Sequence, residues 1–305
     1  MKRIIGRILR KILPYNWYKL AANGFIIVPS YYKSIFIDIE RYMDLATPES
    51  SEKDIMLMRK YAHILDKGLH RKDVEVGHSS DIYKLLKQKI TKLKESQYAQ
   101  DPTYKWAIQK LIKYEHLQNN PDHFQPFIGK FSSPKIDYED LLSLIKSRRS
   151  NRVFQSKTIP IEIIVKLKES VNWAANSCNK QPIKLFTTND PSLSKKCLAC
   201  CKGGTGFGDF IPSFWVFTSN CKGYVWPEEM YLPVLDTSLG AQNVFLIAQT
   251  LGISGTILSW AQKTQEEENE IRNLLNIPID YIIIFCAVMG YPEFQYETPI
   301  RKTIG

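Results

Sequence analysis

A short basic segment stands out among the residues that could take part in chemistry. The stretch RRSNRVF at residues 148–154 places three arginines and a serine within five positions, directly after an apolar helical pattern. Each guanidinium offers several N–H donors in a planar fork that matches the oxygens of a phosphate or a carboxylate. The segment is therefore either a solvated charge patch or the binding site of an anion.

Two further segments carry groups that can bind a polar ligand. Asn179 and Gln181 lie in AANSCNKQP at residues 174–182, a stretch typical of a turn between a helix and a strand. Their carboxamides can donate and accept hydrogen bonds, although asparagine and proline also form turns without any ligand. Near the C-terminus, GYPEFQYETPIRK at residues 290–302 ends a strand and returns with two basic residues, Arg301 and Lys302.

Alternating helices and strands after residue 137 must position these groups. Helices are expected over residues 137–148, 159–176, 192–201, 231–252 and 264–276. Strands are expected over residues 183–190, 211–219, 254–260 and 281–292. The run YIIIFCAVMG in the last strand is apolar throughout, which is typical of a central buried strand. This alternation indicates an α/β or α+β arrangement of layers.

The helix expected over residues 231–252 has almost no polar face. A helix that is hydrophobic around its circumference indicates burial rather than a monomer surface. Burial between two copies in a homodimer is one arrangement that satisfies this pattern.

A glycine-rich stretch, GGTGFGD at residues 203–209, follows a cysteine-rich helical pattern instead of a strand. It lacks the full spacing of a dinucleotide-binding turn, so it predicts a loop on the substrate side of a pocket. The aromatic residues expected to close that pocket are Phe207, Phe210, Tyr224 and Trp226.

The first part of the chain is expected to be mainly helical, with helices over residues 50–68, 79–97 and 102–118. The proline- and glycine-containing stretch at residues 123–137 separates two regions, 1–130 and 131–305. Residues 1–14 form a basic amphipathic helical pattern. Such a helix can rest on an anionic membrane surface or pack on its own protein, and periodicity does not separate the two.

The composition narrows the classes of protein to consider. With 305 residues, 44% hydrophobic and 24% charged, the chain has the material for a folded core. Its net charge of +10 suits a phosphorylated ligand or a membrane surface, but no nucleic-acid-binding motif or transmembrane stretch is present. Six cysteines, without a second CxxC or a histidine pair at ligand spacing, predict reduced thiols, no metal site and a cytoplasmic location.

The three polar segments, in this order and among these elements, resemble the nitroreductase family of FMN-dependent oxidoreductases. That family has an RRSxRxF-like segment, a PSxxNxQP-like turn, a DxxxAxQNxxLxA helix, and a GYP strand with a basic tail. Here the helix and the strand after it read DTSLGAQNVFLIAQTLGISGTILSW. The resemblance covers residues 137–305. It implies an α+β, nitroreductase-like fold with a central mixed sheet flanked by helices, preceded by the mainly helical N-terminal region.

The resemblance also implies a chemistry. FMN would be the cofactor and NAD(P)H the co-substrate, in a ping-pong hydride transfer through flavin N5, with two sites at the interface of a homodimer. Asn179 and Gln181 would meet the pyrimidine edge or the ribityl chain. A backbone N–H near Ser259 or Trp260 would meet N5, and no side chain is assigned as catalytic. The residues implied at the flavin phosphate are Arg148, Arg149, Ser150 and Arg152, with Arg301 or Lys302.

Other functions stay open on the sequence alone. The electron acceptor could be a nitro or quinone-like compound or a biosynthetic intermediate. A dehydrogenase of the same fold would need a base, for which Lys180, Lys184 and Tyr224 are candidates. The alternative from a different class is a non-catalytic or flavin-binding scaffold tethered to a membrane-associated complex. The resemblance extends to longer relatives with such an N-terminal extension, and it implies a link to polysaccharide biosynthesis.

Overall fold

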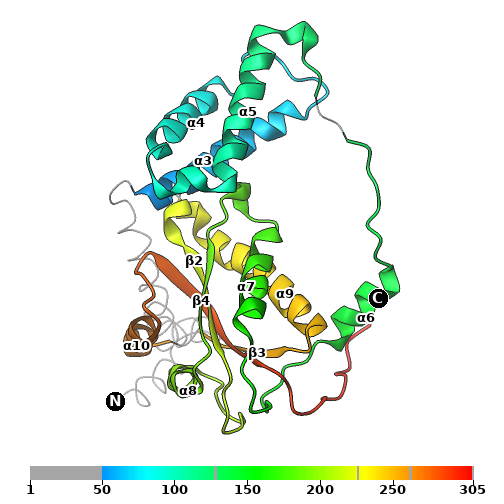
Figure 1. The fold of residues 1–305 in the computed structure, drawn as a ribbon, viewed down its shortest axis with the longest axis vertical. Helices are drawn as coiled ribbons and strands as arrows, with labels where there is room; N and C mark the ends of the chain where they lie inside the picture. The colour runs from blue at the N-terminus through cyan, green and yellow to red at the C-terminus, as the bar shows by residue number, and fades with distance from the viewer. Residues whose placement is uncertain (1–49, 127–128, 225–226, 261–262, 304–305) are drawn as a thin grey trace, which may run out of the picture.

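The computed structural model describes residues 50–126, 129–224, 227–260 and 263–303 of the chain (Figure 1). Its first part consists of α3 (Ser51–Leu69), α4 (Ser80–Leu93) and α5 (Pro102–Asn119), which pack around one apolar core. The three predicted helices are thereby confirmed, although α4 ends four residues before the predicted end. The basic pattern at residues 1–14 lies outside the described residues.

A buried carboxylate joins the first two of these helices. Asp54 of α3 is 1% exposed and lies 2.6 Å from the Nζ atom of Lys89 and 3.1 Å from that of Lys92, both on α4. Burial opposes ionisation of this carboxyl group, but hydrogen bonds and charge from the two lysines lower the pKa of Asp54 below its ordinary value. The charged form is therefore the one that holds α3 against α4.

The second part of the chain contains the remaining helices and the sheet. The helices are α6 (Tyr138–Ser147), α7 (Ile161–Ser170), α8 (Pro191–Ala199), α9 (Leu232–Thr250) and α10 (Gln265–Leu275). The strands are β1 (Ile183–Thr188), β2 (Phe214–Asn220), β3 (Ser254–Leu258) and β4 (Tyr281–Gly290). Short 3-10 helices lie between them, among them η3 (Val171–Trp173), η4 (Ser177–Asn179), η5 (Cys221–Gly223) and η6 (Pro227–Tyr231). The predicted order of helices and strands is confirmed throughout this part.

The described strands form one sheet in the order β1-β2-β4-β3. The three pairings, β1 with β2, β2 with β4 and β3 with β4, are all antiparallel. The α+β class is confirmed, whereas the predicted mixed character is not found among these pairings. A continuously apolar strand such as β4 requires cover on both faces, and that requirement is met here without any parallel neighbour.

Helices cover both faces of the sheet (Figure 1). Trp215 and Phe217 of β2 point toward α7 and α9, while Phe214 and Val216 point toward α8 and α10. This alternation follows from the two-residue period of a strand. It leaves the ends of the strands and the edge strand β3 as the places where polar segments can lie.

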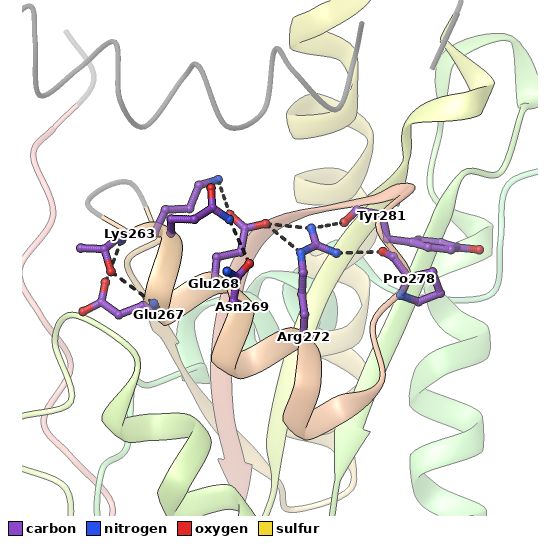
Figure 2. A network of polar contacts seen from close by, with 9 residues as sticks. Lys263, Glu267, Glu268, Asn269, Arg272, Pro278 and Tyr281 are labelled. Atoms are coloured by element: carbon purple, nitrogen blue, oxygen red, sulfur yellow. Dashed lines mark hydrogen bonds and ion pairs between the residues drawn. The ribbon is translucent and has the colours of Figure 1, made fainter. Parts of the chain in front are cut away.

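A polar network fixes α10 against the start of β4 (Figure 2). Arg272 donates through Nε and Nη2 to Oε1 of Glu268 at 2.9 and 2.8 Å, and its guanidinium also reaches the carbonyl oxygens of Pro278 and Tyr281. At the other end of α10, Thr264 and Glu267 form a capping box. Both ends of α10 are thus held by polar contacts, which fixes the position at which the loop from β3 enters the helix.

The helical first part is not separate from the sheet. Helix α3 packs against η4 and η5, and the side chain of Glu52 accepts a hydrogen bond from Asn220 at the end of β2. The division at residues 130 and 131 therefore stays a prediction. Among the described residues, no helix is long and apolar enough to cross a membrane.

Candidate functional site

The basic segment lies along the edge strand β3. Helix α6 ends at Ser147, and Arg148 leaves it with an extended backbone. Ser254 of β3 then donates from its hydroxyl to the carbonyl oxygen of Arg149 at 2.9 Å, and Thr256 donates in the same way to that of Asn151 at 2.5 Å. Alternate residues of a strand point to the same side, so the two hydroxyls hold the segment in register.

The tail after β4 pairs with the same segment. The amide of Gln155 donates to the carbonyl oxygen of Tyr291 at 2.9 Å, and the amide of Glu293 donates to that of Val153 at 3.1 Å. Further along, the side-chain amide of Asn151 donates to the carbonyl oxygen of Phe294 at 3.2 Å. Two segments 140 positions apart in the sequence, at Val153 and Glu293, are thereby joined.

Arg149 serves this junction with its whole guanidinium. Nε donates to the carbonyl oxygen of Glu297 at 3.0 Å, and Nη2 donates to the hydroxyl of Thr298. Nη1 donates to two carbonyl oxygens at the end of α6, those of Lys146 and Arg148. Most of its N–H donors are occupied by the protein itself, so Arg149 mainly holds the tail and the end of α6 in place.

Arg148 is different, because it lies half-buried beside other cations. Burial, Arg301 and Arg149 each lower the pKa of the Arg148 guanidinium. Within the part of the chain that the structure describes, no hydrogen bond or ion pair engages the side chain of Arg148 or Arg301. Cations that repel one another without a carboxylate between them form a donor set that an anion would stabilise. A phosphate dianion fits this arrangement by charge and by the donor chemistry of guanidinium groups.

The glycine-rich stretch borders the same region. The amide of Gly208 donates to the carbonyl oxygen of Arg152 at 3.0 Å, and the Arg152 guanidinium lies 5.9 Å from the ring centre of Phe207. At the start of the stretch, Lys202 forms an isolated bridge with Ser259. The loop thus spans from the basic segment to the end of β3. Among the predicted phosphate and N5 groups, the exposed residues include Ser150, Arg152, Ser259 and Lys302.

Trp260 follows Ser259 but turns inward. Its side chain is 4% exposed and packs in the core between the sheet and α10. The indole Nε1 is buried without a hydrogen-bond partner among the described residues. An unpaired buried donor at this position is unusual, and it marks the loop after β3 as a place where a partner group could be missing.

The turn at residues 176–181 has an unusual backbone. Cys178, Asn179 and Gln181 have φ values of 53°, 53° and 54°, in the left-handed region that costs side-chain-bearing residues free energy. Asn176 stabilises the turn by accepting from the amide of Gln181 at 2.9 Å. The side chain of Gln181 donates in turn to that of Asn179 at 3.1 Å. The two predicted amides therefore lie together.

A buried polar network supports this turn from below. Asp236 of α9 is 1% exposed and accepts from the amide and the hydroxyl of Ser177 at 3.0 and 2.9 Å, and from the hydroxyl of Tyr224 at 2.8 Å. Lys180 is fully buried, and its ammonium pairs with Glu229 at 2.7 Å. These partners occupy Lys180 and Tyr224, so neither is placed as a free base, and Tyr224 does not close a pocket. Trp226 lies outside the described residues.

The turn and the basic segment lie at opposite ends of the sheet. Ile183, at the start of β1, pairs with Ser219, which pairs with Ile282 near the start of β4. The tail leaves β4 after Gly290, eight residues farther on. At about 3.3 Å per residue this places the two groups about 25 Å apart within one chain.

Comparison with known proteins now adds to this geometry. A curated protein of Archaeoglobus fulgidus, named an NADH dehydrogenase/NAD(P)H nitroreductase, is 28% identical over 162 residues, which cover 52% of this chain and 89% of that protein. A protein of the same name from Methanothermobacter thermautotrophicus is 24% identical over 176 residues, 80% of its length. Over about half of its length the chain is thus similar in sequence to proteins named as nitroreductases. No family model matches it.

Solved structures give a weaker likeness. An FMN-dependent nitroreductase of Clostridium difficile aligns with a TM-score of 0.45 and 20% identity, covering 52% of this chain and 91% of that one. At that level the solved structure says nothing of the ligand of this chain.

Sequence reasoning missed several residues of this candidate site. Asn151 lies inside the basic segment, and its burial at 3% exposed cannot be predicted from neighbours that are mostly charged. Asp236 is a lone acidic residue in an apolar helix, which is a signal that could have been used, because a buried carboxylate needs donors. Arg59 of α3, which donates to the carbonyl oxygen of Lys180 at 3.3 Å, gave no signal.

The cysteines in the described residues are free thiols. Cys197, Cys201 and Cys286 are buried together between α8 and the sheet, and burial raises the pKa of the Cys286 thiol well above its ordinary value. Among the described residues, no group of three or more His, Cys, Asp or Glu side chains has the geometry of a metal site. These three thiols therefore act as apolar side chains that pack in the core.

Proposed function

We propose that the chain is an FMN-dependent NAD(P)H oxidoreductase. The observation that carries the proposal is the cluster of Arg148, Arg301 and Arg149. Arg148 is half-buried, is repelled by the other two cations, and has no anionic partner among the described residues. The names of the two curated relatives support the nicotinamide co-substrate and the class of reaction. A flavin phosphate is an anion that suits both the arginine cluster and this class of reaction.

The residues divide into three roles. Arg148 and Arg301 would hold the phosphate, with Ser150, Arg152 and Lys302 available at the exposed rim. Arg149 keeps the tail in place. When bound, FMN supplies two-electron transfer, taking hydride from NAD(P)H and passing electrons to an acceptor in a second, ping-pong half-reaction.

Asn179 and Gln181 would hold the polar parts of the flavin by amide hydrogen bonds. Their turn lies about 25 Å from the arginines of the same chain, which is too far for one FMN. A homodimer removes this difficulty, because the turn of one copy can approach the arginines of the other and form two equal sites.

The exposed face of α9 favours such a dimer. Val234, Leu235, Leu239 and Ile247 are between 40% and 53% exposed although the helix has almost no polar face. Ile161 and Val165 of the neighbouring α7 are exposed at 69% and 56%. Exposed apolar side chains gathered on two helices that pack against each other are typical of a protein–protein contact. We propose that a second copy covers it.

The loop after β3 would stabilise the reduced flavin. A backbone N–H near Ser259 or Trp260 would stabilise negative charge on the reduced ring, and the core packing of Trp260 would keep that N–H in position. The glycine-rich loop that bridges Ser259 and Arg152 would border the acceptor. We propose a nitro or quinone-like acceptor, or a biosynthetic intermediate of that electronic character.

Membrane contact through residues 1–14 is a second, independent proposal. Five basic residues alternate with an apolar stripe there, a pattern that suits an anionic lipid surface. Deletion of residues 1–14 should abolish sedimentation with anionic vesicles. Sedimentation that survives the deletion would contradict it.

Purification and chromophore analysis test the proposed function. The protein should show a flavin absorbance spectrum and release about one FMN per chain, and NADH or NADPH added without oxygen should bleach that absorbance. A colourless protein that also refuses added FMN would contradict the proposal and favour a non-catalytic scaffold.

A further inference from the structure

One side chain of the helical first part reaches the flavin-side turn. Arg59 of α3 is 9% exposed. Its Nη1 donates to the carbonyl oxygen of Lys180 at 3.3 Å across 121 positions of sequence. Its Nη2 donates to Oδ2 of Asp101 at 3.0 Å, and its Nε donates to the hydroxyl of Thr103 at 2.8 Å. A single guanidinium therefore joins α3, the start of α5 and the turn.

Two of these three contacts fix the guanidinium itself. Asp101 caps α5, since its carboxylate accepts from the amide of Thr103 at 2.8 Å. Burial lowers the pKa of Arg59, while the charge and hydrogen bond of Asp101 raise it. Because Asp101 and Thr103 hold two of its nitrogen atoms, the Arg59 guanidinium is oriented so that Nη1 donates to the carbonyl oxygen of Lys180.

The turn needs such a partner. Cys178, Asn179 and Gln181 all adopt left-handed backbone conformations, which persist only where surrounding contacts enforce them. Asp236 enforces the turn at Ser177, before the left-handed residues. Arg59 enforces it at Lys180, between Asn179 and Gln181. The Arg59 contact adds to the hydrogen bond between Asn176 and the amide of Gln181, and it is the one that ties the Lys180 carbonyl group to the helical first part.

We propose that Arg59 is a positioning residue, which clamps the carbonyl group of Lys180 and so keeps Asn179 and Gln181 in the arrangement that binds the flavin. The flavin half of this statement rests on the proposed function. The clamp itself is a property of the polypeptide and can be measured with no flavin present. It makes the helical first part a working component of the site.

Two substitutions of Arg59 distinguish the effect of its hydrogen bonds from the effect of its positive charge. Lysine at position 59 keeps the positive charge beside Asp101 but cannot donate to three acceptors in fork geometry. Arg59→Lys and Arg59→Gln therefore test the fork and the charge separately. Arg71 is a matched control, because it pairs with Asp73 at 3.0 Å on the exposed surface of the same helical part.

Cys178 provides the readout inside the turn. It is half-exposed, whereas Cys197, Cys201, Cys221 and Cys286 are buried. Cys200 is also half-exposed, but burial, followed by its neighbouring groups, raises the pKa of its thiol to about 11. In a Cys200→Ser background, one rapid adduct with iodoacetamide on the flavin-free protein reports on the turn. Additional adducts in the mass spectrum would identify global unfolding instead.

The clamp predicts that Arg59→Lys and Arg59→Gln both speed the modification of Cys178 about tenfold, with a single adduct, while Arg71→Gln leaves it within about twofold. Unchanged Cys178 modification in both Arg59 variants would overturn the proposal. So would a normal rate in Arg59→Lys alone, since charge would then suffice. A lower melting temperature with unchanged modification would assign Arg59 to helix packing only.

Flavin binding gives the second readout. The dissociation constants of FMN and of riboflavin should both rise about tenfold in Arg59→Gln, because the turn meets parts that the two ligands share. An effect on FMN alone would contradict the placement. If the parent protein binds neither ligand, the proposed function fails, whereas the Cys178 experiment still decides the clamp.

Discussion

The hydroxyl of Ser254 donates a hydrogen bond to the backbone carbonyl of Arg149, 2.9 Å away, although the two residues are 105 positions apart. Thr256 repeats this contact two residues along the same strand, at Asn151. The basic segment is therefore placed by backbone contacts to β3 rather than by its charges. Removing the Arg148 side chain should leave the segment where it is, which makes Arg148 substitutions clean tests of ligand binding, whereas Arg149 also holds the tail.

Inorganic phosphate should stabilise the flavin-free protein. Millimolar phosphate relieves the repulsion between Arg148 and Arg301, so it should raise the melting temperature by about 2–4 °C relative to chloride at equal ionic strength. Differential scanning fluorimetry measures this directly. Arg148→Ala should lose most of the increase, while Arg71→Ala should retain it. An equal increase in both variants would show that phosphate binds elsewhere.

Replacing Asn151 should loosen the tail. Asn151→Ala removes the donor to the carbonyl of Phe294 and should cost about 1–2 kcal/mol of unfolding free energy. The amide of Glu293, which donates to Val153, should then exchange its hydrogen about tenfold faster. Asn269→Ala on the exposed face of α10 is the control. Unaltered exchange at Glu293 in Asn151→Ala would mean that other contacts hold the tail.

A charge on the exposed face of α9 should separate the two copies. Leu239→Glu places a carboxylate in the proposed interface and should convert a dimer to a monomer in light-scattering chromatography, with loss of bound FMN. Ile112→Glu, at an exposed apolar position of α5, should change neither property. A Leu239→Glu monomer that keeps FMN at wild-type affinity would contradict a site shared between two chains.

Acid should weaken the contact between α3 and α4. The folded pKa of Asp54 is lowered, so its stabilising effect is complete above the unfolded pKa of about 3.9 and is lost as the pH falls through the folded value. Asp54→Asn should lower stability at pH 7 by about 1–3 kcal/mol and by less near pH 3. Urea unfolding at the two pH values measures both. A deficit independent of pH would exclude the charge as its cause.

Much of the fold follows from local patterns. The apolar run of β4 and the apolar helix α9 were predicted within two residues at each end, because both are long and have a clear hydrophobic pattern. The meeting of the basic segment with the tail was anticipated only through the family resemblance. Composition alone gives no reason for residues 149 and 297 to touch.

Other features depend on partners that a sequence does not display. Arg149 looked like a phosphate ligand, yet backbone carbonyls take most of its donors, and every residue offers such a carbonyl. The antiparallel pairing of the sheet depends on where the connections cross, which hydropathy does not encode. The contact of Arg59 with Lys180 joins two regions whose packing no local pattern predicts.

The affinity of FMN compared with riboflavin, in the wild-type protein and in Arg148→Ala, tests the central claim most directly. Riboflavin lacks the phosphate, so the wild-type protein should bind FMN about 100-fold more tightly than riboflavin. Arg148→Ala should reduce that ratio about tenfold or more while leaving the riboflavin dissociation constant unchanged. Equal affinities in the wild-type protein, or an equal loss for both ligands in Arg148→Ala, would contradict a phosphate site at the arginine cluster.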